Sequence, residues 1–168
     1  MNCANEPSPA FSHGKAQIIS PLVRSAREAF DAGMWLIGGG LNAQAMVMLH
    51  NAIELVFKAE LEGVHRVLIA DNRKLDYETL KSLLREAFAK HPSGASLSIP
   101  EFDFEKTITF TEALKRVTDL RPHLVGPVRK DLECLQELRN DVVHYGQNPA
   151  AVRDYVEAIA VVAIPFLQ

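Results

Sequence analysis

Apolar residues recur every three or four positions along most of the chain, which is the spacing of one face of an α-helix. A first helix is predicted to begin at Ser20-Pro21, where a capping hydroxyl precedes a proline at the first helical position, and to end at Gly38-Gly39-Gly40. A second, of a length that suits a central helix, extends from about Asn42 to Leu61. The predicted buried positions are Leu22, Val23, Ala26, Ala29, Phe30 and Met34 in the first helix, and Ala45, Met48, Leu49, Ala52, Val56 and Ala59 in the second.

The rest of the chain carries further helix start and stop signals. Asp76 is the expected cap of a third helix, which ends before His91-Pro92-Ser93-Gly94. Thr109 and Glu112 have the spacing of a capping box for a short helix through about Asp119. Two more helices are predicted, from Pro127 to Tyr145 before a stop at Gly146, and from Asn148-Pro149 almost to the end of the chain.

No segment has the pattern of a β-strand, so the expected fold class is all-α, a bundle of four long helices plus short ones. Residues 95–106 show no period and are expected to form a loop. Residues 1–19 contain proline, serine and glycine with little periodicity, which predicts a flexible N-terminal arm. Residues 20–168 then form one helical domain, because 168 residues with 48% hydrophobic content suit a single buried core.

Charge and cysteine content narrow the classes of function. A net charge of −3 argues against a broadly basic nucleic-acid-binding protein, although a local basic patch is compatible with it. No apolar run approaches the roughly 20 residues that span a bilayer, and the polar N-terminus lacks the regions of a signal peptide. We therefore expect a cytoplasmic protein that does not associate with membranes. Cys3 and Cys134 are too few for a disulfide framework or a thiolate metal site and are predicted to be plain thiols.

The helix predicted from Pro127 to Tyr145 carries candidate chemistry near its end. At about 100° per residue, Arg139 falls within the apolar arc of this helix, while Asn140 and His144 lie together at its polar border. A guanidinium on an apolar face needs a carboxylate, a phosphate or a subunit interface to compensate for its desolvation. An arginine can bind a phosphate and a histidine can transfer a proton, so the pair suits chemistry at a phosphate. The apolar arc comprises Val128, Leu132, Leu135, Leu138 and Val142.

Other interpretations of these residues remain open. Arg139 could bond a buried carboxylate such as Glu54, with His144 capping carbonyl groups at the helix C-terminus. Glu54 and Lys58 have the spacing of a helical ion pair. His50 and Glu54 could supply two metal ligands, but no third ligand is evident, so a hydrogen bond at the edge of the core is the simpler interpretation.

Two segments of the chain resemble HEPN domains. In Leu138-Arg139-Asn140-Asp141-Val142-Val143-His144, as in the HEPN signature, an arginine followed by a polar residue precedes a histidine by five positions on a late helix. Further upstream, the segment from Leu49 to Ala59 is similar to the early helix of that family, with a small residue, a glutamate and a lysine in helical register. The resemblance covers residues 20–165 and implies a HEPN-like helical domain.

The resemblance implies a metal-independent RNA endonuclease that acts as a homodimer, with the motifs of two subunits forming one site and with no cofactor. His144 would take the proton of a ribose 2′-hydroxyl or protonate the leaving 5′-oxygen. Arg139 would stabilise the phosphate, and Asn140 would orient His144 or bind a phosphate oxygen. The expected products carry 2′,3′-cyclic phosphate and 5′-hydroxyl ends. Glu54 and Tyr145 are expected to contact these residues and help to position them.

The family also suggests a setting in defence, toxin or stress-response systems, with an inhibitory or regulatory protein as a further partner. Some HEPN toxins carry a tyrosine two positions after the histidine, where an antitoxin adds nucleotides. Here Tyr145 follows His144 directly and Gly146 occupies the later position, so that modification is not expected. The alternative function is a non-catalytic HEPN module that dimerises and binds RNA, a nucleotide or a protein partner.

A basic stretch leads into the motif helix and is a predicted contact for the RNA backbone, although solvated helix ends explain it equally well. No run of aromatic residues accompanies it, so sequence-specific recognition of bases is not indicated. The predicted RNA-binding residues are Lys115, Arg116, Arg121, Arg129 and Lys130.

Overall fold

The computed structural model describes residues 20–71, 76–90 and 106–145. These ranges contain no strand, and only an isolated antiparallel bridge joins Ala70 to Thr107 within them. The all-α prediction is therefore confirmed for the described part of the chain. Its helices are α1 (Pro21–Gly38), α2 (Asn42–Val64), η1 (Arg66–Ile69), α3 (Tyr77–Lys90), α4 (Phe110–Leu120), α5 (Pro122–Val125), η2 (Gly126–Val128) and α6 (Arg129–Tyr145).

Three predictions lie outside the described residues: the arm over residues 1–19, most of the loop over residues 95–106, and the helix after Asn148-Pro149. The number of long helices in the bundle therefore stays a prediction. None of the helices in the described ranges has the length and apolar character that crossing a bilayer requires.

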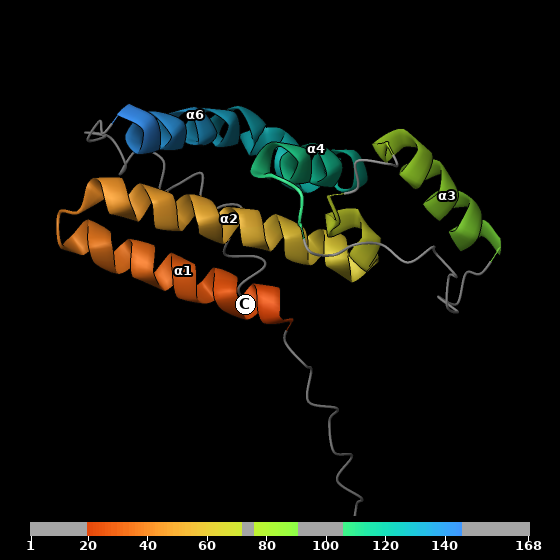
Figure 1. Cartoon of the computed structure of the whole chain (residues 1–168), viewed down its shortest axis with the longest axis horizontal. Helices are drawn as coiled ribbons and strands as arrows, with labels where there is room; N and C mark the ends of the chain where they lie inside the picture. The colour runs from red at the N-terminus through yellow and green to blue at the C-terminus, as the bar shows by residue number, and fades with distance from the viewer. Residues whose placement is uncertain (1–19, 72–75, 91–105, 146–168) are drawn as a thin grey trace, which may run out of the picture.

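Ser20 caps α1 as predicted. Its hydroxyl oxygen accepts a hydrogen bond from the backbone N–H of Leu22 at 3.3 Å, and its O–H donates to Glu62 near the end of α2 at 3.0 Å. Where the chain turns between the two helices, Gly40 has a φ of 74°, a left-handed conformation that favours glycine. The helices α1 and α2 consequently lie side by side and antiparallel (Figure 1).

A glycine brings α1 and α2 close together. Gly33 is buried opposite Leu49, and a methyl group added at Gly33 would lie 2.7 Å from two carbon atoms of that leucine. The prediction that Met34 and Met48 belong to the core is wrong, since they are 40% and 38% exposed. Each is adjacent in sequence to a residue of the contact, Gly33 or Leu49, and so lies about 100° around its helix from that contact. Trp35, next along α1, is 76% exposed. Predicted positions that are buried are Ala26, Ala29, Ala45, Leu49, Ala52 and Val56.

Replacing Gly33 with alanine is expected to lower the free energy of unfolding by about 1–2 kcal/mol, because overpacking against Leu49 outweighs the gain in helix propensity. Gly63, in the last turn of α2, is the matched control, since an added methyl group there meets no atom within 4 Å. Gly63→Ala should raise stability by up to about 1 kcal/mol. Urea unfolding of both variants measures the difference, and equal stability of the two would show that the contact at Gly33 is not tight.

The central helix is α2, as predicted. It packs against α1 on one side and against α4 and α6 on the other (Figure 1). Its second buried face includes His50, Ile53 and Phe57, and the ring centroid of Phe57 lies 5.9 Å from that of Phe110 at the start of α4. The apolar arc predicted near the C-terminal motif is confirmed by the buried Val128, Leu132, Leu135 and Val142 and the partly buried Leu138.

The ends of the later helices follow the predictions with two differences. Asp76 caps α3, because its carboxylate accepts hydrogen bonds from the backbone N–H and the hydroxyl of Thr79 at 3.0 and 2.6 Å. At α4, Thr109 accepts from the backbone N–H of Glu112 at 3.5 Å, but the Glu112 carboxylate bonds Arg116, so only half of the capping box forms. The helix predicted from residue 127 begins as the 3₁₀ turn η2 and continues as α6.

Candidate functional site

The three predicted catalytic residues lie on the half of α6 that is next to the first half of α2 (Figure 1). Arg139 and Asn140 are half-buried, and His144 is exposed one turn beyond Asn140. Val142, on the same helix, is buried with 9% exposure. Arg139 and Asn140 therefore border the contact between α6 and the core, while His144 is accessible from solvent.

Arg139 carries a charge that no carboxylate neutralises among the described residues. Its Nη1 donates a hydrogen bond to Oδ1 of Asn140 at 3.1 Å, and its Nε is buried without a hydrogen-bond partner. Moving a cation out of water is unfavourable unless an anion or a set of acceptors compensates for it. The guanidinium of Arg139 is therefore available to bind an anion.

Glu54 does not bond Arg139, so the carboxylate named in the alternative interpretation has another partner. It accepts a hydrogen bond from Nζ of Lys58 at 2.6 Å, which confirms the predicted ion pair within α2. Lys58 is itself buried and also donates to the hydroxyl of Thr107 at 2.9 Å. The pair thus fixes the chain before α4 to α2 and leaves the charge of Arg139 uncompensated.

His50 lies in the core between α2 and α4. Its side chain is 6% exposed, and its ring centroid is 4.3 Å from that of Phe110. Burial lowers the pKa of His50 from 6.5 to about 4; the carboxylate of Glu54 opposes this shift, and the positive charge of Arg139 adds to it. The imidazole is therefore neutral at neutral pH, and the charge of Arg139 helps to keep it so.

Stability is expected to fall as the pH is lowered towards 4 because of His50. The pKa of the folded-state imidazole is about 4 against an ordinary 6.5, so the unfolded chain binds a proton that the folded chain excludes between these values. This contribution of His50 to the free energy of unfolding is roughly 3 kcal/mol. It is fully present above pH 6.5 and is lost as the pH falls to about 4. Urea unfolding at pH 7 and pH 4.5 measures it. His50→Gln should flatten this dependence and His144→Gln should not; an equal loss in wild type and His50→Gln would contradict the assignment.

The sequence pattern did not predict that the charge of Arg139 affects His50. One signal was present, because His50, Ile53 and Phe57 recur at helical spacing and so share a buried face of α2. The second signal, the packing of that region against α6, comes from the three-dimensional structure alone.

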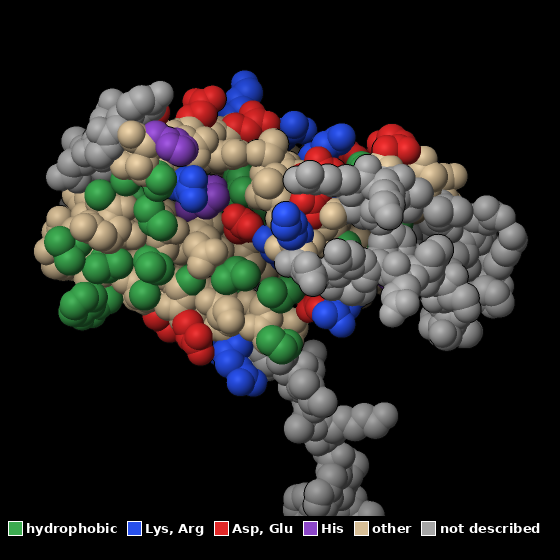
Figure 2. Space-filling model, in the orientation of Figure 1, with side chains coloured by type: hydrophobic (Ala, Val, Ile, Leu, Met, Phe, Trp, Pro, Cys, Tyr) green, Lys and Arg blue, Asp and Glu red, His purple; other side chains and the backbone are tan. Residues whose placement is uncertain are grey.

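Charged and histidine side chains gather over α2 and α6 on the face shown in Figure 2, beside hydrophobic side chains over α1 and α2. An exposed apolar area with a polar border is typical of a contact surface. The large hydrophobic residues that are exposed in the described structure are Met34, Trp35, Leu41, Met48 and Val143.

Four of the predicted RNA-binding residues lie on the surface. Lys115, Arg121, Arg129 and Lys130 are exposed. Two of them pair with carboxylates: Nε of Arg129 lies 2.8 Å from Glu133, and Nε of Arg121 lies 3.9 Å from Glu60. Exposed pairs of this kind are weak, so a phosphate could compete for either arginine.

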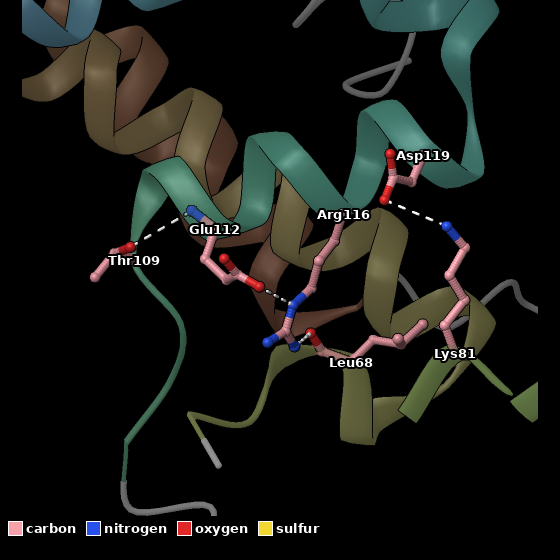
Figure 3. A network of polar contacts seen from close by, with 6 residues as sticks. All are labelled: Leu68, Lys81, Thr109, Glu112, Arg116 and Asp119. Atoms are coloured by element: carbon pink, nitrogen blue, oxygen red, sulfur yellow. Dashed lines mark hydrogen bonds and ion pairs between the residues drawn. The ribbon is translucent and has the colours of Figure 1, made fainter. Parts of the chain in front are cut away.

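Arg116, by contrast, is not a surface residue, which corrects its predicted place among the RNA contacts. Its side chain is buried, with Nε 2.9 Å from the Glu112 carboxylate and Nη1 donating to the carbonyl oxygen of Leu68 at 2.7 Å (Figure 3). The guanidinium carbon lies 5.0 Å from the ring centroid of Tyr77 on α3. Because these contacts join α4 to η1 and α3, Arg116 has a structural role.

The remaining candidate residues add little chemistry. Within the described ranges, no group of three or more His, Cys, Asp or Glu side chains could hold a metal ion. Cys134 is a free, exposed thiol on α6, and Cys3 lies outside the described residues. Tyr145 ends α6, and its side chain is outside the described part of the structure.

No protein-family model matches the chain, and no curated protein or solved structure is significantly similar to it. Function therefore has to be inferred from the geometry around Arg139 and His144.

Proposed function

We propose that this protein is a metal-independent RNA endonuclease of the HEPN type that acts as a homodimer. The main support is the half-buried guanidinium of Arg139, which bonds the side chain of Asn140 but has no carboxylate partner among the described residues. An RNA phosphodiester would supply the missing anion. His144, exposed on the same helix, would supply an imidazole that can transfer a proton.

In the proposed reaction, the ribose 2′-oxygen attacks phosphorus, and the bond from phosphorus to the 5′-oxygen of the next nucleotide breaks. Neutral His144 accepts the proton of the 2′-hydroxyl while water protonates the leaving 5′-oxygen, or protonated His144 donates a proton to the 5′-oxygen while water accepts that of the 2′-hydroxyl. Arg139 stabilises the charge on the pentavalent phosphate, and Asn140 holds Arg139 through the 3.1 Å hydrogen bond. The products carry 2′,3′-cyclic phosphate and 5′-hydroxyl ends.

Homodimer formation would complete the site. Arg139 and His144 are separated by roughly 140° around an ideal helix, so one copy of α6 does not direct both at the same phosphate. A twofold pairing of two such helices would place the arginine of one subunit near the histidine of the other. The exposed Met34, Trp35 and Met48 offer an apolar surface for that contact.

The proposed setting is a cytoplasmic defence, toxin or stress-response system, with an inhibitory or regulatory protein that restrains cleavage. The exposed cations Lys115, Arg121, Arg129 and Lys130 would contact the RNA backbone. Because Arg116 is buried, it is left out of this set.

A second candidate function is a non-catalytic HEPN module that binds RNA, a nucleotide or a protein partner. One observation favours it: among the described residues, no side chain forms a hydrogen bond that would orient His144. A catalytic base is commonly oriented by a third group. Anion binding by Arg139 requires no such group.

Incubation of the full chain with mixed RNA in EDTA separates the two candidates. The nuclease is expected to cleave with no divalent cation and to leave 2′,3′-cyclic phosphate ends, which resist a phosphomonoesterase until acid opens the ring. Intact RNA at high protein concentration would rule out the nuclease, and RNA that is bound but uncleaved would support the binding module.

A further inference from the structure

A second histidine, on α2, has no part in the cleavage step proposed above. His50 is 6% exposed and is held against the ring of Phe110, with an angle of 33° between the two ring planes. Its Nε2 is buried and has no hydrogen-bond partner in the described part of the chain. Buried polar atoms in native proteins are nearly always hydrogen-bonded, so this nitrogen needs an explanation.

Arg139, on the neighbouring helix α6, also has a nitrogen that lacks a hydrogen-bond partner among the described residues. Its Nε is also buried without a partner in the described ranges, and its charge is close enough to affect the imidazole of His50. The acidic residue of α2 that also affects His50, Glu54, is bound by Lys58 at 2.6 Å. The helices α2 and α6, which pack against each other, therefore each carry a buried nitrogen without a partner, and the charge of Arg139 on α6 is uncompensated among the described residues.

We propose that His50 and Arg139 of the same chain bind one oxyanion together, the imidazole donating from Nε2 and the guanidinium from Nε. A neutral imidazole with its proton on Nε2 is a donor, and an arginine Nε is always one. One tetrahedral oxyanion would satisfy both nitrogens and neutralise the charge of Arg139. Since Arg139 is half-buried and His50 is buried, the oxyanion would enter from the surface at Arg139.

This inference rests on the proposed function only for the identity of the ligand, which in RNA is the phosphodiester group. It adds a division of roles to that function. The anion-binding half of each site is complete within one subunit, on α2 and α6, and only the proton-transferring His144 has to come from the partner chain. His50 is thus a ligand-binding residue rather than a member of the buried core alone.

Sulfate is a suitable probe because it stays a dianion over the whole pH range in which proteins are folded. In an NMR titration of the full chain with sulfate, the side-chain N–H of Arg139 and the imidazole of His50 should shift together with a single Kd. Sulfate should also raise the pKa of His50, since a bound dianion opposes the effects of burial and of Arg139 and adds to that of Glu54.

Variants separate the two donors. His50→Leu removes the donor at similar volume and should weaken sulfate binding about tenfold, whereas His50→Gln keeps a terminal N–H and should stay within about threefold. Arg139→Ala should abolish saturable binding. Arg24→Ala is the control, because Arg24 is an exposed cation on α1, and its Kd should equal that of wild type.

Two results would overturn the inference: sulfate binding to His50→Leu as tight as to wild type, or no saturable shift at His50 in the wild-type chain. The second measurement needs no variant, so a His50→Leu chain that fails to fold leaves the test intact. Failure of the proposed function gives a different pattern, in which sulfate binds through His50 but RNA stays intact. RNA cleavage that depends on His144, without any sulfate response at His50, would support the proposed function and contradict this inference.

Discussion

His144→Gln is expected to reduce RNA cleavage by about 10²–10⁴-fold, the usual contribution of a general acid or base. The side chain is exposed, and among the described residues it forms no hydrogen bond or ion pair, so the change in the free energy of unfolding should stay within about 0.5 kcal/mol. The measurement is the initial rate of cleavage of a labelled RNA in EDTA, with thermal unfolding of the same samples.

The control for this variant is His123→Gln, which makes the same substitution at another exposed histidine, on α5. It should cleave RNA at the wild-type rate. Unchanged cleavage by His144→Gln would remove His144 from the reaction, and equal losses in both variants would point to a general effect of charge.

Mixing two inactive chains tests whether the site is shared. Arg139→Ala and His144→Gln should each be inactive, and their mixture should regain activity if Arg139 of one subunit works with His144 of the other. His50→Leu mixed with Arg139→Ala should regain much less, because His50 and Arg139 are expected to act within one chain. Recovery in the second mixture equal to that in the first would contradict this arrangement.

Arg116→Met is expected to lower the free energy of unfolding by roughly 3–4 kcal/mol, which corresponds to a decrease in Tm of about 10 °C. The substitution keeps most of the buried stem but removes both donors. The carbonyl of Leu68 and the carboxylate of Glu112 then lose their partner (Figure 3). The ring of Tyr77 also loses the nearby cation of Arg116, although those of Lys81 and Lys115 remain. Urea unfolding followed by circular dichroism measures the loss.

Lys115→Met is the matched control, because Lys115 is the exposed neighbour of Arg116 on α4 and also places a cation near the ring of Tyr77, at 5.7 Å. Its stability should stay within about 0.5 kcal/mol of wild type. If Arg116→Met were equally stable and bound RNA less tightly, the original prediction of a surface RNA contact would be restored. If it is unstable, Arg116 belongs to the framework that holds α3 and η1 against α4.

Local signals in the sequence were sufficient for most of the described helices. The capping of α1 by Ser20 and of α3 by Asp76 depends on residues two or three positions away, so it is visible without the fold. The apolar arc of α6 is equally local, and it placed Arg139 on the face of the helix that packs against the core. The exposure of Met34 was not visible, because it depends on how closely Gly33 approaches Leu49.

The errors at the site have one physical origin, which is contact between residues far apart in the chain. Arg116 sits among basic residues that resemble a solvated face, but its burial is determined by the carbonyl of Leu68, 48 positions earlier. The charge of Arg139 affects His50 only because α2 packs against α6. The sequence offered two cationic partners for Glu54, Arg139 and Lys58, and in the structure Glu54 pairs with Lys58.

The exposure of Trp35 has a practical consequence for fluorescence experiments on this protein. It is the only tryptophan in the sequence and is 76% exposed in the folded chain. Its indole is already largely in water, so its fluorescence should change little when the protein unfolds. The same emission should move to shorter wavelengths when another molecule covers α1, which makes Trp35 an intrinsic reporter of association and a poor reporter of folding.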